Sequence, residues 1–393
     1  MRQDAIRVRM QSAMEPDSIS SGTTSDGASG RFGPVFAVLN DAIAAHAFPG
    51  CAFGVLARGE VVLQGALGRF TYEENAPVVT PETAYDVASL TKVVSTTAAA
   101  MLLHQRGVLD LDAPVGEFLP GFVVGRPPGD LARHVKLRHL LAHNSGLPGY
   151  VEFFRTAATP TALFRACLEL PLEAEPGARS EYSDPGFILL GKALEVYTRE
   201  YLATWTRREI FEPLGLTATG FCPRPAARVA IPPTEDDTEF RHRRIQGEVQ
   251  DENAFLLKGA AGHAGLFSNA PNMLRFAGEI LKASSGGTLE SEHSGLFDGA
   301  TLGLFAERQS PEGSSRALGW DTPSAKSSAG KYFSPRSIGH LGFSGCSMWI
   351  DLDAEIAVVL LTNRTWPSRQ SQLIREVRPA FHDAVREALP LSS

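Results

Sequence analysis

Ser89-Leu90-Thr91-Lys92 places a hydroxyl group and a primary amine three residues apart near the start of a predicted helix. A helix is expected over residues 88–103, because this stretch lacks proline and glycine, is rich in alanine and leucine, and is followed by Gly107. Residues i and i+3 of a helix are surface neighbours, with Cβ atoms about 5–6 Å apart. The lysine amine can therefore reach the serine hydroxyl, and the unpaired N–H groups of the first turn can face an anion.

A serine hydroxyl becomes a nucleophile only when a base removes its proton or a cation stabilises the alkoxide. Lys92 could supply either function. To act as the base it must be neutral, so its pKa would have to fall from about 10.4 towards 7. Burial beside Val87, Val93 and Val94, with a second cation nearby, would lower the pKa. Taken alone, the four-residue pattern also fits a solvated helix turn.

A second cluster is the polar turn over residues 181–186, which precedes an apolar run and contains Tyr182. A tyrosine hydroxyl held near a lysine ammonium has a depressed pKa and can shuttle a proton. The turn therefore offers a candidate acid–base group 93 residues beyond Ser89.

A third cluster, over residues 339–345, indicates a strand that opens with glycine. A turn follows it, and the apolar run at 356–361 predicts a buried strand. Glycines inside a strand usually mark the close approach of a ligand or of another backbone. This segment is therefore a candidate wall of a binding site.

These three clusters, in this order, resemble the serine β-lactamase and penicillin-binding-protein superfamily, most closely its class C-like esterase and D-aminopeptidase branch. The S-x-x-K, Y-x-N and K/H-x-G signature of that branch maps onto Ser89 to Lys92, Tyr182 to Asp184, and His340 to Gly342. Residues 139–147 and 262–268 also resemble sequence segments of the family. The likeness covers about residues 34–388.

The resemblance implies acyl transfer in two halves, through an acyl-enzyme that is then hydrolysed. Ser89 would be the acylated nucleophile, and Lys92 and Tyr182 would share the base and acid roles. The N–H groups of Ser89 and Phe343 would form the oxyanion hole, in which each donor is typically worth about 2.7–4 kcal/mol. No metal and no cofactor are expected.

Two positions depart from the family pattern, and both concern the substrate. Many relatives have asparagine, which can donate a hydrogen bond to an amide carbonyl, where this chain has Asp184, which only accepts when ionised. Lactam-hydrolysing members usually have lysine where this chain has His340, which is mostly neutral at pH 7 and attracts a carboxylate less. We therefore expect a carboxylesterase that prefers neutral, short-acyl esters and turns over β-lactams slowly at most. The expected substrate-binding residues are Phe343, His340, Gly342 and Asp184.

Other functions stay open at this stage. Some relatives act on peptides that end in D-amino acids, so a D-amino-acid peptidase or a β-lactamase acting on murein-derived peptides or β-lactams is an alternative. A receptor that is acylated and stays acylated, like a penicillin sensor, would share the nucleophile and differ only in deacylation.

The expected fold class is α/β, of the α+β type. Strand-like runs at residues 51–56 and 61–68 predict a hairpin, and residues 35–47 and 373–389 carry apolar side chains at helical spacing. The resemblance implies that these terminal helices pack on an antiparallel sheet and that the active site lies between this part and an all-helical lobe.

We expect one β-lactamase-like catalytic domain over residues 34–393, with the α/β lobe at about 34–104 and 256–393 and the helical lobe at about 105–255. Residues 284–335 are rich in serine, glycine and proline, which predicts loops that could cover the cleft.

The composition favours an enzyme with a small substrate. The chain has 393 residues, 43% of them hydrophobic, and can bury one large core or two lobes. A formal net charge of −7 argues against a nucleic-acid partner. No run of 18 apolar residues predicts a membrane span, and the first 33 residues, expected to be a disordered tail, lack the apolar core of a secretory signal. We expect a cytoplasmic enzyme with an ester or peptide substrate and leave the oligomeric state open.

Several other patterns favour structural roles. His139 and His143 have zinc-binding spacing but lack the glutamate of H-E-x-x-H. Residues 186–192 match half of a phosphate loop, yet their apolar interior indicates a helix core. Structural roles are also expected for an acidic cluster, two tryptophans and four scattered cysteines, and for His263 a place in the pocket wall stays open as well. These residues are Glu248, Asp251, Glu252, His263, Trp320, Trp349, Cys51, Cys167, Cys222 and Cys346.

Overall fold

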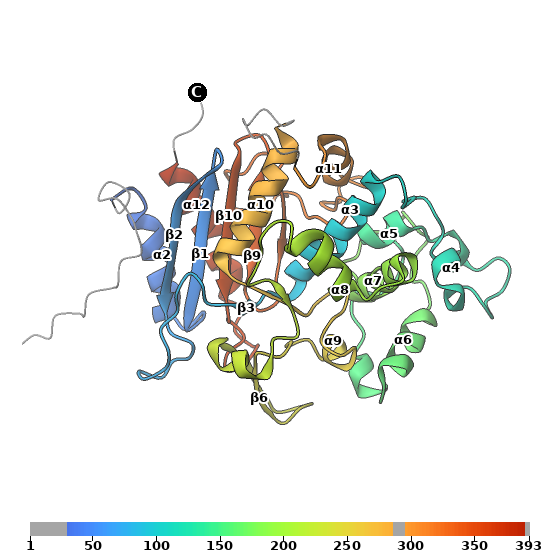
Figure 1. Ribbon diagram of the computed structural model, residues 1–393, viewed down its shortest axis with the longest axis horizontal. Coiled ribbons are helices and arrows are strands. Elements are labelled where there is room, and N and C mark those ends of the chain that lie inside the picture. Colours follow the sequence, from blue (N-terminus) through green and yellow to red (C-terminus); the bar gives the residue numbers. More distant parts are fainter. Residues whose placement is uncertain (1–29, 286–294, 390–393) are drawn as a thin grey trace, which may run out of the picture.

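The computed structural model describes residues 30–285 and 295–389 (Figure 1). Most of the predicted tail, residues 1–29, lies outside this part of the chain. Helix α2 (Gly33–Ala44) begins one residue earlier than the predicted domain boundary, with a proline in its first turn. Proline suits that position because its fixed φ matches the helix and its missing N–H would have no helical partner there.

A five-stranded antiparallel sheet forms the α/β lobe, in the order β2-β1-β10-β9-β8. The predicted hairpin of β1 and β2 is confirmed, and β1 also pairs with β10, so that Cys51 lies opposite Thr362. Residues 338–362 contribute three strands, with β8 at the edge and the turn 342–346 between β8 and β9. The strands are β1 (Gly50–Ala57), β2 (Glu60–Gly68), β8 (Ile338–Leu341), β9 (Ser347–Asp351) and β10 (Ile356–Thr362).

Helices cover both faces of this sheet. Alternate residues of a strand point to opposite faces, and β10 is buried along its whole length. Val358 and Leu360 join a core with α2 and the C-terminal helix α12 (Ile374–Ala388). Val359 and Leu361 face α10 (Ala270–Ser284) and the helical lobe. The predicted packing of the terminal helices on an antiparallel sheet is therefore confirmed.

Helices dominate the second lobe, gathered on the right in Figure 1. They are α4 (Val115–Phe118), α5 (Leu137–Leu141), α6 (Pro160–Leu168), α7 (Asp184–Thr198), α8 (Leu202–Thr206) and α9 (Glu252–Leu256). The prediction that this lobe is all helical was wrong in part, because residues 233–246 form a hairpin of β5 (Pro233–Asp237) and β6 (Arg243–Gln246). A small sheet of β3 (Tyr85–Asp86), β7 (Leu266–Ser268) and β4 (Gly220–Phe221) joins the two lobes.

The predicted helix over residues 88–103 is continuous but has three geometries. A 3₁₀ turn at Ala88–Leu90 leads into a π-helical stretch at Lys92–Thr97 and then into α3 (Ala98–Gln105). All residues from 90 to 103 are buried, including the polar side chains between Thr91 and Thr97, so this is a central helix enclosed on every side. Short π-helical segments are rare and often lie at functional sites.

The stretch predicted as loops, residues 284–335, is only partly irregular. Residues 286–294 lie outside the described part of the chain, and α11 (Gly299–Ala306) is a helix that the serine-rich and glycine-rich composition concealed. The segment 307–337 has no helix and no strand.

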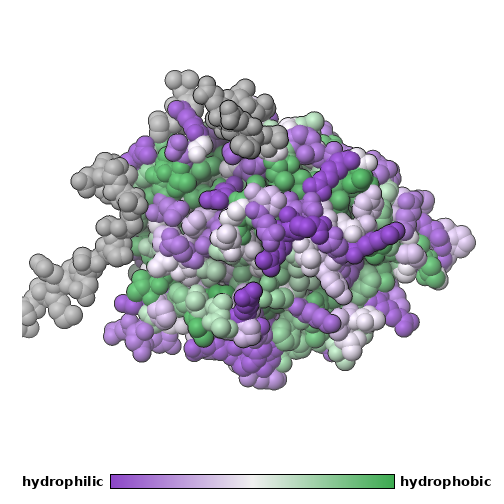
Figure 2. Space-filling model, in the orientation of Figure 1, coloured by the Kyte–Doolittle hydropathy of each residue, from purple (hydrophilic) through white to green (hydrophobic). Residues whose placement is uncertain are grey.

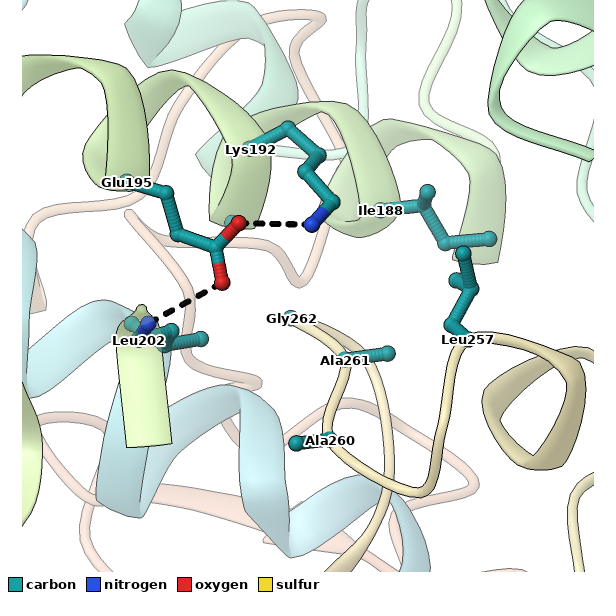
Figure 3. A pocket seen from close by; sticks show the side chains of 9 residues that line it. Ile188, Lys192, Glu195, Leu202, Leu257, Ala260, Ala261 and Gly262 are labelled. Atoms are coloured by element: carbon teal, nitrogen blue, oxygen red, sulfur yellow. Dashed lines mark hydrogen bonds and ion pairs between the residues drawn. The ribbon is translucent and has the colours of Figure 1, made fainter. Parts of the chain in front are cut away.

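Helix α7 confirms that residues 186–192 are helix core. Ser183 caps its first turn by accepting a hydrogen bond from the Gly186 N–H at 3.1 Å. Figure 3 shows a pocket between α7, α8 and residues 257–262, with Lys192 paired to Glu195 at 2.6 Å. Its volume of about 10 Å³ leaves room for about one water molecule, so it is no substrate site.

The surface mixes polar and apolar side chains on the face shown in Figure 2. Among the described residues, no helix is both long and apolar enough to span a bilayer. A cytoplasmic location stays a prediction. The four cysteines are unpaired, and three are buried as expected, whereas Cys222 is exposed.

Candidate active site

Ser89 lies at the junction of the two lobes, at the start of the central helix. The preceding Ala88 has a φ of 47°, a strained value for a residue with a side chain. The buried Asp86 supports this turn, because its Oδ1 accepts from the Ala88 N–H at 2.9 Å and its Oδ2 from the Gln250 N–H at 2.7 Å. Ser89 itself stays partly exposed. The turn therefore presents the hydroxyl from an otherwise buried segment.

Lys92 is completely buried and uses its ammonium group to join three segments. Its Nζ lies 3.0 Å from Ser89 Oγ, 2.7 Å from Asp184 Oδ1 and 3.1 Å from the backbone oxygen of His263. A charged lysine has three hydrogens to donate and cannot accept. The three neighbouring oxygens thus match the ammonium form.

The electrostatics of Lys92 differ from the expectation. Burial acts to lower its pKa, as predicted, but the Asp184 carboxylate and Tyr182 outweigh burial, and the pKa is raised. Within residues 30–285 and 295–389, the ion pair of Lys92 is with an anion, Asp184 at 2.7 Å, and not with a second cation. The condition for Lys92 to act as the base, a lowered pKa, is therefore not met, and the sequence does not show the contact with Asp184 that prevents it.

Tyr182 lies beside the lysine, as the motif predicts. Lys92 Nζ is 4.8 Å from the centre of its ring. Desolvation raises the pKa of Tyr182, while Lys92 and a hydrogen bond with Ser89 oppose this effect without reversing it. The expected depressed pKa of the tyrosine was also wrong, because burial outweighs the influence of Lys92 and the negative charge of Asp184 adds to the effect of burial.

Two histidines pack against the Tyr182 ring, with centroid distances of 4.6 Å for His143 and 5.8 Å for His340. Burial lowers the pKa of both well below the usual value, so both are neutral at pH 7. His143 Nδ1 accepts from the Ser183 N–H at 2.9 Å, which leaves the proton on Nε2. His143 was assigned a structural role, and sequence reasoning missed its contact with Tyr182.

His340 has the opposite tautomer. Its Nδ1 lies 2.8 Å from the backbone oxygen of Leu341, which can only accept, so Nδ1 carries the proton. The buried Nε2 is then a free acceptor, for which the described residues supply no hydrogen-bond partner. The predicted neutral charge of His340 agrees with this arrangement.

The turn 342–346 packs against the segment that carries the nucleophile. Ser344 Oγ donates a hydrogen bond to the backbone oxygen of Asp86 at 2.7 Å. A Cβ atom on Gly342 would lie 2.5 Å from the Val87 oxygen, so only glycine permits this approach. The structure thus brings Gly342 and Phe343 to the Ser89 segment, as the third motif predicts.

Buried donors hold every carbonyl of this turn. Arg378, on α12, donates to the oxygens of Gly342 at 2.6 Å, Cys346 at 2.8 Å and Gly345 at 3.2 Å. Arg364 Nε donates to the backbone oxygen of Phe343 at 2.8 Å, and Thr362 Oγ1 donates to the backbone oxygen of Ser344 at 3.0 Å.

The direction of the Phe343 N–H follows from this arrangement. The Gly342 oxygen and the Phe343 N–H belong to one trans peptide group and point in opposite directions. Because the oxygen points to the buried Arg378, the N–H points away from it.

The other candidate residues have structural partners. Asp251 caps α9 by accepting from the Ala254 N–H at 2.7 Å, and it lies 2.9 Å from His263 Nε2. Glu248 pairs with Arg228 and Arg243, and Glu252 with Arg369. Trp320 and Trp349 are fully buried. In the described part of the chain, no group of three or more histidine, cysteine or acidic residues could hold a metal.

A buried lysine next to an accessible serine, with a tyrosine beside both, defines a serine hydrolase that works through an acyl-enzyme. A family model described as Beta-lactamase matches residues 35–379, so the chain belongs to the β-lactamase family.

Named relatives and solved structures that resemble this chain agree with this family assignment. A Bacillus subtilis (strain 168) protein named N-acetylmuramyl-L-alanine amidase is 31% identical over 81% of this chain and 78% of its own length. The solved structure of EstCE1, a hydrolase with promiscuous acyltransferase activity, superposes with a TM-score of 0.73 at 24% identity and covers 92% of this chain and 100% of its own. A penicillin-binding-protein homologue from Caulobacter crescentus has a TM-score of 0.71 at 20% identity, covering 94% and 99%.

Proposed function

We propose that this chain hydrolyses carboxylic esters through an acyl-enzyme on Ser89. The observation that carries the proposal is the position of Lys92 Nζ, 3.0 Å from Ser89 Oγ and 4.8 Å from the centre of the Tyr182 ring. Tyr182 also makes a side-chain hydrogen bond with Ser89, through which a proton can pass between the two hydroxyl groups beside a fixed positive charge.

In this proposal Tyr182 is the base and Lys92 stays charged. The small fraction of Tyr182 in the phenolate form takes the proton of Ser89 as Oγ bonds to the substrate carbonyl carbon. Tyr182 then returns this proton to the leaving oxygen as the ester bond breaks. In the second half Tyr182 takes a proton from water, the hydroxide attacks the acyl carbon, and the proton ends on Ser89 Oγ.

The oxyanion of each tetrahedral intermediate would be held by the N–H groups of Ser89 and Phe343. The direction of the Phe343 N–H supports this role, because the Gly342 oxygen of the same peptide group is bound to the buried Arg378 and the N–H points away from that residue. Gly342 contributes its lack of a side chain, which lets the turn approach Val87.

Asp184 would act on Lys92 rather than on the substrate. Its Oδ1 accepts from Lys92 at 2.7 Å, and only 15% of the side chain is exposed. It therefore offers no donor to an amide carbonyl. This supports esters over amides, and the preference for neutral, short acyl groups stays a prediction.

A kinetic comparison tests the proposal. Second-order rate constants should be higher for p-nitrophenyl acetate than for a chromogenic cephalosporin, and Ser89→Ala should abolish both activities. Faster turnover of the cephalosporin would reverse the assigned preference, and ester turnover that survives Ser89→Ala would remove the assigned nucleophile.

A peptide or amide substrate is the second candidate function. It is favoured by the name of the Bacillus subtilis relative, an amidase. Release of D-alanine from a D-alanyl-D-alanine peptide at a rate above that of the esters would favour this candidate.

A further inference from the structure

Asp86 lies directly beneath the nucleophile turn (residues 87–90), although none of the three sequence motifs contains it. Only 2% of the residue is exposed. Its two carboxylate oxygens accept hydrogen bonds from different segments, Oδ1 from the Ala88 N–H at 2.9 Å and Oδ2 from the Gln250 N–H at 2.7 Å. The side chain therefore joins the turn that carries Ser89 to the segment that precedes α9.

The backbone of Asp86 contacts the opposite wall of the site. Its oxygen accepts from Ser344 Oγ at 2.7 Å and lies 3.8 Å from Cys346 Sγ. In the small sheet between the lobes, Asp86 pairs with Phe267 across β3 and β7. One residue thus connects the nucleophile turn, the turn 342–346 and the junction of the two lobes.

The negative charge of Asp86 is poorly compensated. A buried carboxylate is costly unless a cation pairs with it. Arg241 compensates this charge only in part, because its guanidinium pairs with Asp237 at 2.9 Å, and the negative charge of Asp251 acts in the opposite sense. Burial raises the pKa of Asp86 to about 6, although its two N–H donors oppose this shift. Carboxyl groups perturbed in this way cluster at functional sites.

The ionisation of Asp86 bears on the direction of the Ser89 N–H. Ala88 has the left-handed φ of 47°, and the Ser89 N–H belongs to the peptide group that follows it. An ionised carboxylate only accepts hydrogen bonds, whereas a protonated carboxyl carries a donor on one oxygen. The N–H groups of Ala88 and Gln250 lie on different oxygens. Protonation therefore weakens one of the two bonds, whichever oxygen takes the proton.

We propose that the ionised carboxylate of Asp86 is a positioning group for acyl transfer on Ser89, and that its protonation loosens the nucleophile turn and slows the reaction. Asp86 does not touch the substrate. It acts through the Ala88 N–H on the Ser89 N–H, which is an assigned oxyanion donor. This inference rests on the proposed role of Ser89, and it adds a dependence on pH below neutrality that Lys92 and Tyr182 do not supply.

Asp86→Asn tests the proposal, because asparagine keeps the shape of the side chain but offers one acceptor oxygen to two N–H groups. The measured quantity is kcat of the unchanged protein divided by kcat of the variant, for p-nitrophenyl acetate between pH 5 and pH 8. Absorbance is followed at the wavelength at which p-nitrophenol and its anion absorb equally. The dependence on Tyr182 cancels in this ratio.

The ratio should be about 10–100 at pH 8, because a displaced oxyanion donor costs less than a lost one, which is worth about 10²–10³ in kcat. It should fall about 5–10-fold between pH 8 and pH 5, where about nine-tenths of a carboxyl with this pKa is protonated. The midpoint should lie near pH 6, and KM should stay similar. A purely structural role would give a ratio that does not depend on pH.

Asp351→Asn is the matched control. Asp351 is also fully buried, and its two oxygens accept from three backbone N–H groups at 3.0–3.2 Å. It ends β9, at the opposite end of the strand from the turn 342–346. The ratio for this variant should be the same at pH 5 and pH 8.

A measurement on the unchanged protein needs no variant to fold. Its kcat should show an additional step near pH 6 on top of the steady fall caused by protonation of Tyr182. Tryptophan fluorescence that stays constant over this range would show that the chain remains folded.

An Asp86→Asn ratio that is the same at pH 5 and pH 8, or a kcat of the unchanged protein without this step, would overturn the positioning role. If the unchanged protein hydrolyses no ester at pH 8, the proposed function fails instead. The same ratio is then measured from release of D-alanine from a D-alanyl-D-alanine peptide, because both candidate functions use Ser89.

Discussion

Arg378 Nη2 donates to the backbone oxygen of Gly342 at 2.6 Å, which couples the C-terminal helix to the turn beside the nucleophile. Arg378 is 7% exposed and makes two further bonds to the same turn, to Gly345 and Cys346. The guanidinium thus fixes the peptide group whose other end is the Phe343 N–H. In our account Arg378 positions an oxyanion donor without touching the substrate.

Replacing Arg378 with methionine should lower kcat about 10–100-fold with little change in KM. The side chain keeps its bulk, but the carbonyls of Gly342, Gly345 and Cys346 lose their hydrogen bonds from the guanidinium, so the turn is held less firmly and the Phe343 N–H can leave the oxyanion. Loss of a whole donor of this kind costs about 10²–10³ in kcat. The measurement is steady-state hydrolysis of p-nitrophenyl acetate.

Arg386→Met is the control for this variant. Arg386 is on the same helix and lies 3.6 Å from Asp351, away from the turn. It should lose stability without a comparable loss of kcat. If Arg378→Met and Arg386→Met lose kcat equally, Arg378 has no positioning role.

Asp184→Asn should shift the rising limb of the pH–rate profile to lower pH. The charge of Asp184 raises the pKa of both Lys92 and Tyr182. Without it, the Tyr182 phenolate forms at lower pH, and the base becomes available sooner. The profile of kcat/KM against pH measures this shift, and it has to extend above pH 10, because burial raises the pKa of Tyr182 above its ordinary value of about 10. A limb that stays in place or moves upwards would show that Tyr182 is not the base.

Gly342→Ala should impair both stability and activity. The new Cβ would lie 2.5 Å from the Val87 oxygen, and backbone atoms cannot move aside as a flexible side chain would. Overpacking of this kind typically costs about 1–3 kcal/mol. Gly303→Ala, in α11, is the control, because a Cβ atom there would meet nothing within 4 Å and alanine favours a helix. A thermal melt in which both variants match the unchanged protein would contradict the close approach.

The sequence predicted the parts of this structure that depend on local pattern. The apolar runs of β1, β2 and β10 and the amphipathic spacing of α2 and α12 specify their elements directly. The S-x-x-K motif placed Ser89 and Lys92 correctly, because i and i+3 neighbours on a helix depend on few other contacts.

Features that depend on distant segments could not be predicted in the same way. Burial acts to lower the pKa of Lys92, and Asp184, 92 residues away, and Tyr182 outweigh this effect and raise the pKa. The backbone oxygen of His263 also accepts a hydrogen bond from Lys92, and a backbone contact of this kind leaves no trace in the sequence. Asp86 and Arg378 belong to none of the three sequence motifs. Only the folded chain shows that one supports the nucleophile turn and the other holds the turn 342–346.

The central claim is that Ser89 becomes covalently acylated and is then freed by water. Intact-protein mass spectrometry during turnover of p-nitrophenyl acetate tests this most directly. We predict one acetyl adduct, mapped to Ser89, that appears within the first turnover, disappears once the ester is consumed and never forms in Ser89→Ala. An adduct that persists would indicate an acylated receptor, and turnover with no adduct on Ser89 would contradict the account.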